Sequence, residues 1–531
     1  MFNRRQFGQM LGAGTLGTLL AKAPATFAQD NNTLRLATTV SDLQSVDAHY
    51  AIGTQDRIVA DLVYSGLLRF KPGTEDQFEP DLAESMPEVE INADGTQSWT
   101  FVLREGVIPH PINGTALPEL TVEDIVFSFT KAADVNTSVY SFDYDGWVME
   151  SDLETREVRI TVPNPISELL FIPKVANFSG GLIVPRAAFD ILGPGGLISH
   201  PVGTGPFKYS AYTPQNRFEL VAHPDFYRGA PQLDGVHVVY LPDPTSRELA
   251  LDAGDVEVID GVREMTWVNR ITRSDELAVD VFGVSNSMNI HLDTNHAILQ
   301  DIRVREAIVK GINRESHASI AGSPVSGIQY SVTSVNTVAG GLTEEEAEAA
   351  GVNYQHDPQG AVALLAEAGY PEGFELDLVG SEMDIYRVHY EVLQEEMRQI
   401  GIKVNLEIVQ HATMHELIRQ GRNAITLYSV HRANPDIFLT QFFTTDSGPT
   451  NFCGFVVDEL RDAARIETDP AAQNELWKQA NIEILRNFAA FAPTYSNYVY
   501  ARKNTVDYGH ELIACVSSYP GFTENTSMDG D

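Results

Sequence analysis

Segments typical of strands and of helices alternate along this chain, with no linker between them. Between residues 30 and 500 there is no long Pro- or Ser-rich tract, no low-complexity segment and no short repeat. A length of 531 residues allows two or three domains at about 150 residues each. The mixture of element types predicts an α/β fold. Because no linker separates the domains, we expect the chain to cross between them more than once.

Local sequence patterns place several of these elements. Residues 98–104 alternate, with Trp99, Phe101 and Leu103 on one face of a half-buried strand. Thr121 and Asp124 form a capping box at the start of a helix. Further helices are expected from Asp301, from Asp357-Pro358, over residues 388–400 and over residues 470–488, and further strands over residues 34–40, over residues 157–162 and from Gly401.

The chain is strongly acidic. It has 36 Lys and Arg against 73 Asp and Glu, a formal net charge of -37. Basic surfaces bind nucleic acids and anionic membranes, so both are excluded as expected partners. Self-repulsion of this charge favours a monomer. Two cysteines, Cys453 and Cys515, are too few for a disulfide scaffold; they either pair with each other or stay as two separate thiols.

The N-terminus has the pattern of an export signal. Arg4-Arg5 and Phe7 precede a weakly apolar run over residues 10–20, and small residues end at Ala28. The apolar run is shorter than the ~20 residues that span a bilayer. We therefore expect a twin-arginine signal peptide over residues 1–28, removed after Ala28 or Ala25. The mature chain is then expected to be soluble and periplasmic.

Familiar catalytic patterns are missing from the sequence. There is no Gly-x-Ser-x-Gly elbow and no phosphate-binding Gly-x-x-x-x-Gly-Lys loop. His415-Glu416 and His510-Glu511 both lack the second His of a zinc protease helix. The sequence therefore predicts no catalytic residue, no cofactor and no metal site, although catalytic groups distant in sequence leave an enzyme open.

Two neighbouring motifs carry a family resemblance. Gly203–Tyr209 (GTGPFKY) and His223–Gly229 (HPDFYRG) by themselves predict a tight turn and a β-hairpin. Together with residues 80–85, 103–107, 251–259, 301–307 and 366–374, in this order, they resemble the extracytoplasmic solute-binding proteins of the peptide/opine/nickel class of ABC importers, family 5.

The resemblance implies an architecture and a function. The fold would be a two-lobed α/β periplasmic-binding-protein fold with an extra small domain in lobe I and a ligand cleft between the lobes. Lobe I would comprise residues 29–287 and 494–531, with the small domain at about 66–180, and lobe II residues 288–493. The protein would capture a small organic solute or a modified peptide and deliver it to an inner-membrane permease with an ATPase subunit. Two alternatives stay open: an exported hydrolase-like enzyme on this scaffold, and a nickel-chelate binder that uses His431 or His110.

The segment from Tyr428 to Phe438 is expected to contribute to the ligand site. In peptide-binding members, a Trp and then an acidic residue precede a Pro-Asp pair, and the acid binds the α-amino group of the ligand. Aligning Pro435-Asp436 places Tyr428 at the Trp and His431 at the acid. An imidazole cannot supply the charge of a carboxylate, and Gly380 stands where some dipeptide binders have an arginine. We therefore expect an acidic or hydroxyl-rich solute rather than an ordinary dipeptide.

The predicted ligand-binding residues come from four parts of the chain. His431 and Arg432 carry the hypothesis of an acidic solute, and its alternative is that Arg432 points to solvent while His431 only lines the wall. For the other candidates core packing is the alternative, because aromatic side chains serve both purposes. The full set is Tyr50, Trp267, Ser381, Tyr428, His431, Arg432 and Asn434.

Overall fold

One mixed sheet runs through most of the molecule. The computed structural model describes residues 32–177, 179–335, 339–432 and 434–528, so the expected signal peptide lies outside the described residues. Within these residues nine strands form the sheet, in the order β16-β12-β17-β11-β1-β10-β9-β8, with β13 beside β17. Strand β1 is parallel to β10 and β11, and the other pairs are antiparallel. The strands are β1 (Thr33–Thr38), β8 (Phe207–Thr213), β9 (Arg217–Ala222), β10 (Gly235–Tyr240), β11 (Val258–Asp260), β12 (Leu277–Leu292), β13 (Ser326–Ile328), β16 (Ile425–Val430) and β17 (Ala490–Lys503).

Smaller sheets accompany the large one. An antiparallel sheet has the order β4-β5-β7-β6, and β14 pairs with β15 in parallel. Two further pairs are β2 with β3 and β18 with β19. The bounds are β2 (Leu68–Phe70), β3 (Phe78–Pro80), β4 (Glu88–Ile91), β5 (Gln97–Val102), β6 (Val148–Asp152), β7 (Glu157–Val162), β14 (Phe374–Ser381), β15 (Ile402–Val409), β18 (Val506–Asp507) and β19 (Ser527–Met528).

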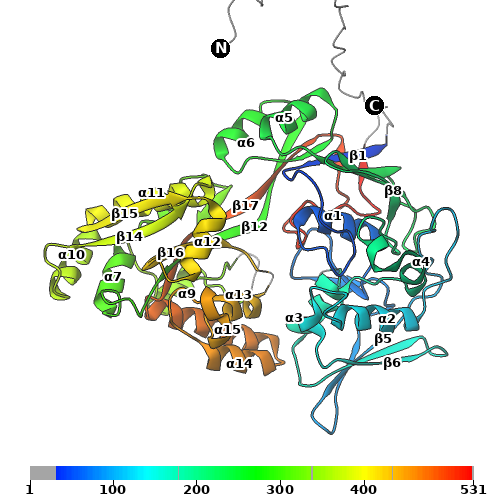
Figure 1. Ribbon diagram of the computed structural model, residues 1–531, viewed down its shortest axis with the longest axis horizontal. Helices are drawn as coiled ribbons and strands as arrows, with labels where there is room; N and C mark the ends of the chain where they lie inside the picture. The colour runs from blue at the N-terminus through cyan, green and yellow to red at the C-terminus, as the bar shows by residue number, and fades with distance from the viewer. Residues whose placement is uncertain (1–31, 178, 336–338, 433, 529–531) are drawn as a thin grey trace, which may run out of the picture. The chain divides into compact units, whose positions relative to one another are not determined.

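Helices are interspersed with the strands along the whole described chain. Helix α11 packs on β14, β15 and β16, and α14 packs beside α15 (Figure 1). The bounds are α1 (Thr54–Val63), α2 (Val122–Ala133), α3 (Glu168–Phe171), α4 (Arg186–Leu197), α5 (Pro244–Ala253), α6 (Met265–Ile271), α7 (Ile302–Gly311), α8 (Arg314–Ala318), α9 (Glu344–Ala349), α10 (Pro358–Glu367), α11 (Asp384–Gln399), α12 (His411–Arg419), α13 (Pro435–Phe442), α14 (Asp458–Ile466) and α15 (Pro470–Arg486). The mixture confirms the predicted α/β class.

Helices α2 and α10 begin where the capping residues in the sequence predict. Thr121 and Asp124 form the predicted capping box of α2. The Asp357 side chain accepts a hydrogen bond from the Gly360 backbone N–H at the start of α10. Helix α11 begins at Asp384, four residues before the prediction, because Tyr386 belongs to the same buried stripe as Tyr390 and continues the 3.6-residue period of that face.

The glycines of the GTGPFKY motif are required by close packing. The motif leads into β8, which forms the predicted hairpin with β9. Gly203 lies against the end of α1, where an added Cβ would be 2.3 Å from the Val63 carbonyl oxygen. Gly205 has the same constraint, at 2.7 Å from the Leu62 carbonyl oxygen. Any larger residue at either position would push the hairpin away from α1.

The buried hydrophobic side chains divide into separate clusters. The largest cluster consists of side chains between Met288 and Phe491. Four others draw on residues before 283 and after 497, with only Ala321 and Val325 from the intervening part. None of the helices in the described part of the chain has the length and apolar character needed to cross a bilayer.

Two long strands connect these clusters. The first part of β12, Leu277–Phe282, pairs with Tyr498–Lys503 of β17, and the second part, Asn286–His291, pairs with residues 490–496 of the same strand. The register shifts between Phe282 and Asn286. The strands run side by side through the middle of Figure 1. Bulges of this kind bend a strand pair. The paired strands β12 and β17 can therefore change direction between Phe282 and Asn286.

The two cysteines remain separate thiols. Both are free, with Cys453 buried and Cys515 partly buried. Burial raises the pKa of each thiol to about 12. Of the two possibilities left open by the sequence, the structure supports separate thiols.

Candidate functional site

The segment after β16 brings His431 and Arg432 to the wall of a small hollow. The hollow is partly open to solvent and is also lined by Ser287 of β12 and by Thr333 and Ser334. His431 and Arg432 therefore share this lining with three hydroxyl-bearing residues. The Ser287 hydroxyl donates to Oε1 of Gln329, and that of Thr333 accepts from the side-chain amide of Asn481. Its water-accessible space is about 10 Å³, room for about one water molecule, so any larger solute requires the walls to move apart.

His431 has a carboxylate neighbour from a distant part of the chain. Its Nε2 lies 3.6 Å from Oε1 of Glu75, in the loop between β2 and β3. The Glu75 side chain is 7% exposed, and Oε1 receives no hydrogen bond within the described part of the structure. Sequence analysis did not find Glu75, because nothing in its local sequence marks a binding residue.

Arg432 does not point freely into solvent. Its Nε donates a hydrogen bond of 2.8 Å to Oε1 of Gln441, and one terminal nitrogen donates to the backbone carbonyl of His431. Burial lowers the pKa of its guanidinium, which nevertheless stays charged because the pKa of arginine starts above 12. The structure therefore contradicts the alternative in which Arg432 is a free surface residue.

Tyr428 belongs to an aromatic group behind this segment. Its ring centroid lies 5.1 Å from that of Phe442, 5.4 Å from Phe452 and 5.3 Å from the imidazole of His415. The side chain is half-buried. Strand alternation places Tyr428 and Val430 on the same face of the sheet, and Val430 lines the hollow together with His431.

Asn434 caps helix α13. Its side-chain oxygen accepts a hydrogen bond of 3.0 Å from the backbone N–H of Ile437, and the residue is buried. The structure thus gives Asn434 a local role, in which it sets where the loop carrying His431 meets the helix.

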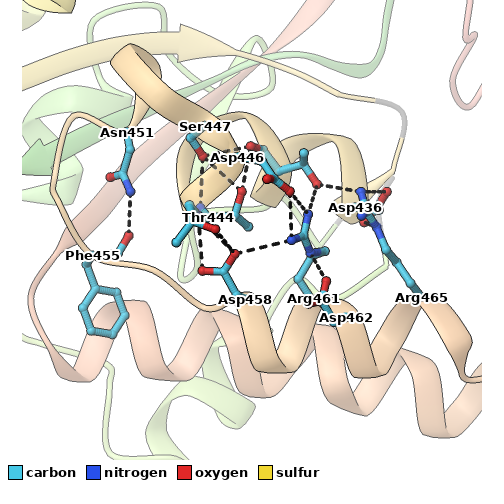
Figure 2. A network of polar contacts seen from close by, with 12 residues as sticks. Asp436, Thr444, Asp446, Ser447, Asn451, Phe455, Asp458, Arg461, Asp462 and Arg465 are labelled. Carbon is cyan, nitrogen blue, oxygen red and sulfur yellow. Dashed lines mark hydrogen bonds and ion pairs between the residues drawn. The ribbon is translucent and has the colours of Figure 1, made fainter. Parts of the chain in front are cut away.

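A network of charged side chains fixes α13 in place (Figure 2). Asp436, the acid of the Pro-Asp pair, binds Arg465 of α14 at 2.6 Å, and Arg465 also donates to Thr440. Arg461 binds Asp446 and Asp458. The Pro435-Asp436 pair therefore anchors the end of the segment from Tyr428 to Phe438 and is not part of the lining of the hollow.

Ser381 lies at the carboxyl end of β14 and is fully buried. Its Oγ is 3.0 Å from Nδ1 of His411 and accepts a hydrogen bond from the backbone N–H of Met383. His411 in turn reaches His415, which contacts Tyr428. Ser381 is therefore connected to Tyr428 through His411 and His415. These two histidines were not predicted as site residues, although their i, i+4 spacing is visible in the sequence.

The remaining two candidates lie elsewhere. Tyr50 donates a hydrogen bond to the Asn136 carbonyl, and its ring lies 5.7 Å from Nζ of Lys131. Trp267 is 5% exposed in a hydrophobic cluster and donates to Glu248. The structure does not bring either residue together with the segment from Tyr428 to Asn434.

The described residues contain no group of three or more His, Cys, Asp and Glu placed to hold a metal ion. His110, considered for a nickel chelate, is buried, and its Nε2 lies 2.9 Å from the carbonyl of Gly205. Burial lowers the pKa of His110 to about 3. The contact with the Gly205 carbonyl indicates that His110 stabilises the turn of the GTGPFKY motif.

Comparison with known families identifies the chain. The model for bacterial extracellular solute-binding proteins, family 5 (middle region), matches residues 77–459. The chain belongs to this family. The family 5 resemblance read from the sequence is thereby confirmed, and with it the function of a solute-binding protein of an ABC importer. The family consists of binding proteins rather than enzymes, so the hydrolase alternative is not favoured.

Individual family 5 relatives cover nearly the whole chain. Heme-binding protein A of Haemophilus influenzae is 27% identical, over 87% of each chain. Di/tripeptide-binding protein 2 of Pseudomonas aeruginosa is 26% identical, over 86% of this chain and 88% of its own. Among solved structures, MoaA of A. tumefaciens R10 in complex with mannopinic acid is 33% identical, with a TM-score of 0.74, over 94% of this chain and 99% of its own. These matches confirm the two-lobed periplasmic-binding-protein fold.

Proposed function

We propose that this family 5 protein binds an acidic, hydroxyl-bearing solute of the opine type. The observation that carries the proposal is that His431 and Arg432 line one hollow together with the hydroxyl-bearing residues Ser287, Thr333 and Ser334. Guanidinium groups bind carboxylates through charge-assisted hydrogen bonds, and hydroxyl groups both donate to and accept from a polyol. The 33% identity to a protein solved with mannopinic acid supports the same solute class.

Glu75 supplies a complementary group. Mannopinic acid carries carboxylates, hydroxyls and a secondary amine, and the amine is cationic at neutral pH. The buried Oε1 of Glu75, which receives no hydrogen bond in the described structure, lies beside His431. In this proposal Glu75 binds the amine and so replaces the acid that peptide binders have at the position of His431. A peptide with a modified terminus is the second candidate solute, because its amine would bind the same carboxylate of Glu75.

The proposal includes hinged lobes. Lobe I would comprise residues 29–287 and 494–531, with a small domain at about 66–180, and lobe II residues 288–493. The division of the hydrophobic clusters near 288 and 491 supports these limits. The bulged ladder of β12 and β17 would serve as the hinge. Opening there would let a solute enter the hollow.

The proposed setting is the periplasm. A twin-arginine signal over residues 1–28 would export the chain, which would act as a monomer and deliver its solute to a membrane permease coupled to an ATPase. Native mass spectrometry of the protein purified from its own periplasm tests this setting. We expect a chain that lacks residues 1–28 and carries one acidic solute; a retained N-terminus would contradict the signal peptide.

Calorimetric titration of the refolded, ligand-free protein tests the solute class. Mannopinic acid, the dipeptide Met-Leu and nickel–histidine are the probes. We expect binding of mannopinic acid at least about 100-fold tighter than of the other two, because only this probe offers partners for Arg432, the hydroxyls and Glu75 together. Tight binding of Met-Leu without mannopinic acid binding would overturn the proposal in favour of a peptide, and preference for nickel–histidine would overturn it in favour of a chelate.

A further inference from the structure

We propose that His411 and His415 form a binding site for a divalent late transition metal ion, of the Cu²⁺, Ni²⁺ or Zn²⁺ type. The two residues lie one turn apart on α12, and their Nε2 atoms are 3.0 Å apart. The solute-binding role does not require this contact, and the proposal does not depend on the identity of the solute.

The distance between the two nitrogens suits a shared metal. Imidazole nitrogens bind Zn²⁺ at about 2.0–2.1 Å, and two such bonds at about a right angle place the nitrogens about 3 Å apart. Histidines at i and i+4 present their rings on one face of a helix, as in helical zinc sites. The present Nε2–Nε2 contact is a hydrogen bond through one proton, which a metal ion would displace.

Ser381 is placed to favour the His411 tautomer that a metal requires. Its Oγ lies 3.0 Å from Nδ1 of His411. When Nδ1–H donates to this oxygen, the lone pair of Nε2 is free for the metal, as is usual for histidine ligands with a fixed outer partner. The arrangement follows from topology, because Ser381 and His411 stand at the carboxyl ends of the parallel strands β14 and β15, which pair Ser381 with Val409.

Aromatic rings surround the two histidines, which stay partly exposed. Tyr386 contacts both imidazoles, and Tyr428 contacts that of His415. Both histidines are half-exposed, so water can complete the coordination, since no third metal-ligating residue joins them within the described chain.

Titration of the whole ligand-free mature protein with CuCl₂ or NiCl₂ tests the site. We expect one metal ion per chain, with binding that weakens when the pH is lowered from 7.5 to 5.5 because protons compete for the nitrogens. Ser381→Ala should weaken binding by about 10- to 100-fold, and His415→Gln should weaken it further. His356→Gln is the control, since this exposed histidine lies outside the site.

Electron paramagnetic resonance of the Cu²⁺ complex keeps the test independent of variant folding. We expect hyperfine coupling to two imidazole nitrogens in the unmodified protein. A spectrum without nitrogen coupling, or His415→Gln protein that binds as tightly as the His356→Gln control, would overturn the proposal. Because no solute is present, failure here would leave the proposed solute class intact.

Discussion

Nε2 of His431 lies 3.6 Å from Oε1 of Glu75. The first residue follows β16 and the second lies between β2 and β3, so the contact joins distant parts of the sequence. We expect from the sequence that His431 stands where peptide binders have an acid, and the structure places the Glu75 carboxylate beside it from another loop. Because the two residues can be replaced separately, the contributions of the imidazole and of the carboxylate to solute binding can be measured one at a time.

Replacing His431 should weaken solute binding. We expect His431→Ala to raise the Kd for mannopinic acid by about 10- to 100-fold, because a hydrogen bond to a charged group contributes about 1.5–3 kcal/mol. Isothermal titration calorimetry measures the change, with His356→Ala as the matched control. An unchanged Kd would remove His431 from the binding site.

Replacing Glu75 tests whether its negative charge strengthens or weakens solute binding. We expect Glu75→Gln to weaken the binding of mannopinic acid by about 10-fold or more, because the amide cannot provide the charge that attracts the secondary amine. Tighter binding in the same titration would instead mean that Glu75 repels the carboxylates of the solute. Asp377→Gln is a control, since this carboxylate lies on the exposed edge of β14.

The buried histidines should make the protein sensitive to acid. Burial lowers the pKa of His49, His110, His291 and His389 to about 3. Between pH 6.5 and about 3 the unfolded chain takes up protons that the folded chain excludes, so the free energy of unfolding falls as the pH is lowered. For each of these histidines, the free energy of unfolding should be about 2 kcal/mol lower at pH 5 than at pH 7. Urea unfolding at the two pH values measures the loss.

His291 offers a single-site check of this acid sensitivity. Both of its ring nitrogens lack hydrogen-bond partners in the described structure, and its ring lies among Phe442, Phe443 and Phe452. His291→Phe should therefore reduce the difference in stability between pH 7 and pH 5 by about 2 kcal/mol. His356→Ala, at an exposed position, should not change the difference. Equal pH dependence in both variants would contradict the explanation.

Lys131 should be essential for stability. Its Nζ lies 2.9 Å from Oδ1 of Asp47, and the two side chains are 2% and 0% exposed. Lys131→Met should lower the free energy of unfolding by about 3–5 kcal/mol, because it leaves a buried carboxylate without its partner. Lys403→Met removes a comparable but exposed pair with Glu375 and should cost less than about 1 kcal/mol. Similar losses for the two variants in urea unfolding would contradict this account.

Local sequence patterns were sufficient for many elements of the fold. Asp357-Pro358 and the Thr121 capping box predicted the starts of α10 and α2, because a cap acts on backbone groups within one helical turn. Ordered motifs such as GTGPFKY were sufficient for the family. They were not sufficient to predict the roles of single aromatic residues. The sequence around Trp267 is compatible with a ligand-binding role and with core packing alike. Its position in a hydrophobic cluster depends on residues that are distant in the sequence.

The sequence by itself thus determined the α/β class, the family and most helix limits, since these depend on interactions over a few residues. Only the tertiary structure decided which distant groups meet. It paired β12 with β17, brought Glu75 to His431, and placed Ser381 beside His411. The physical reason is that strand pairing and side-chain contacts between remote segments are set by the packing of the whole chain, for which a single sequence carries no local signal.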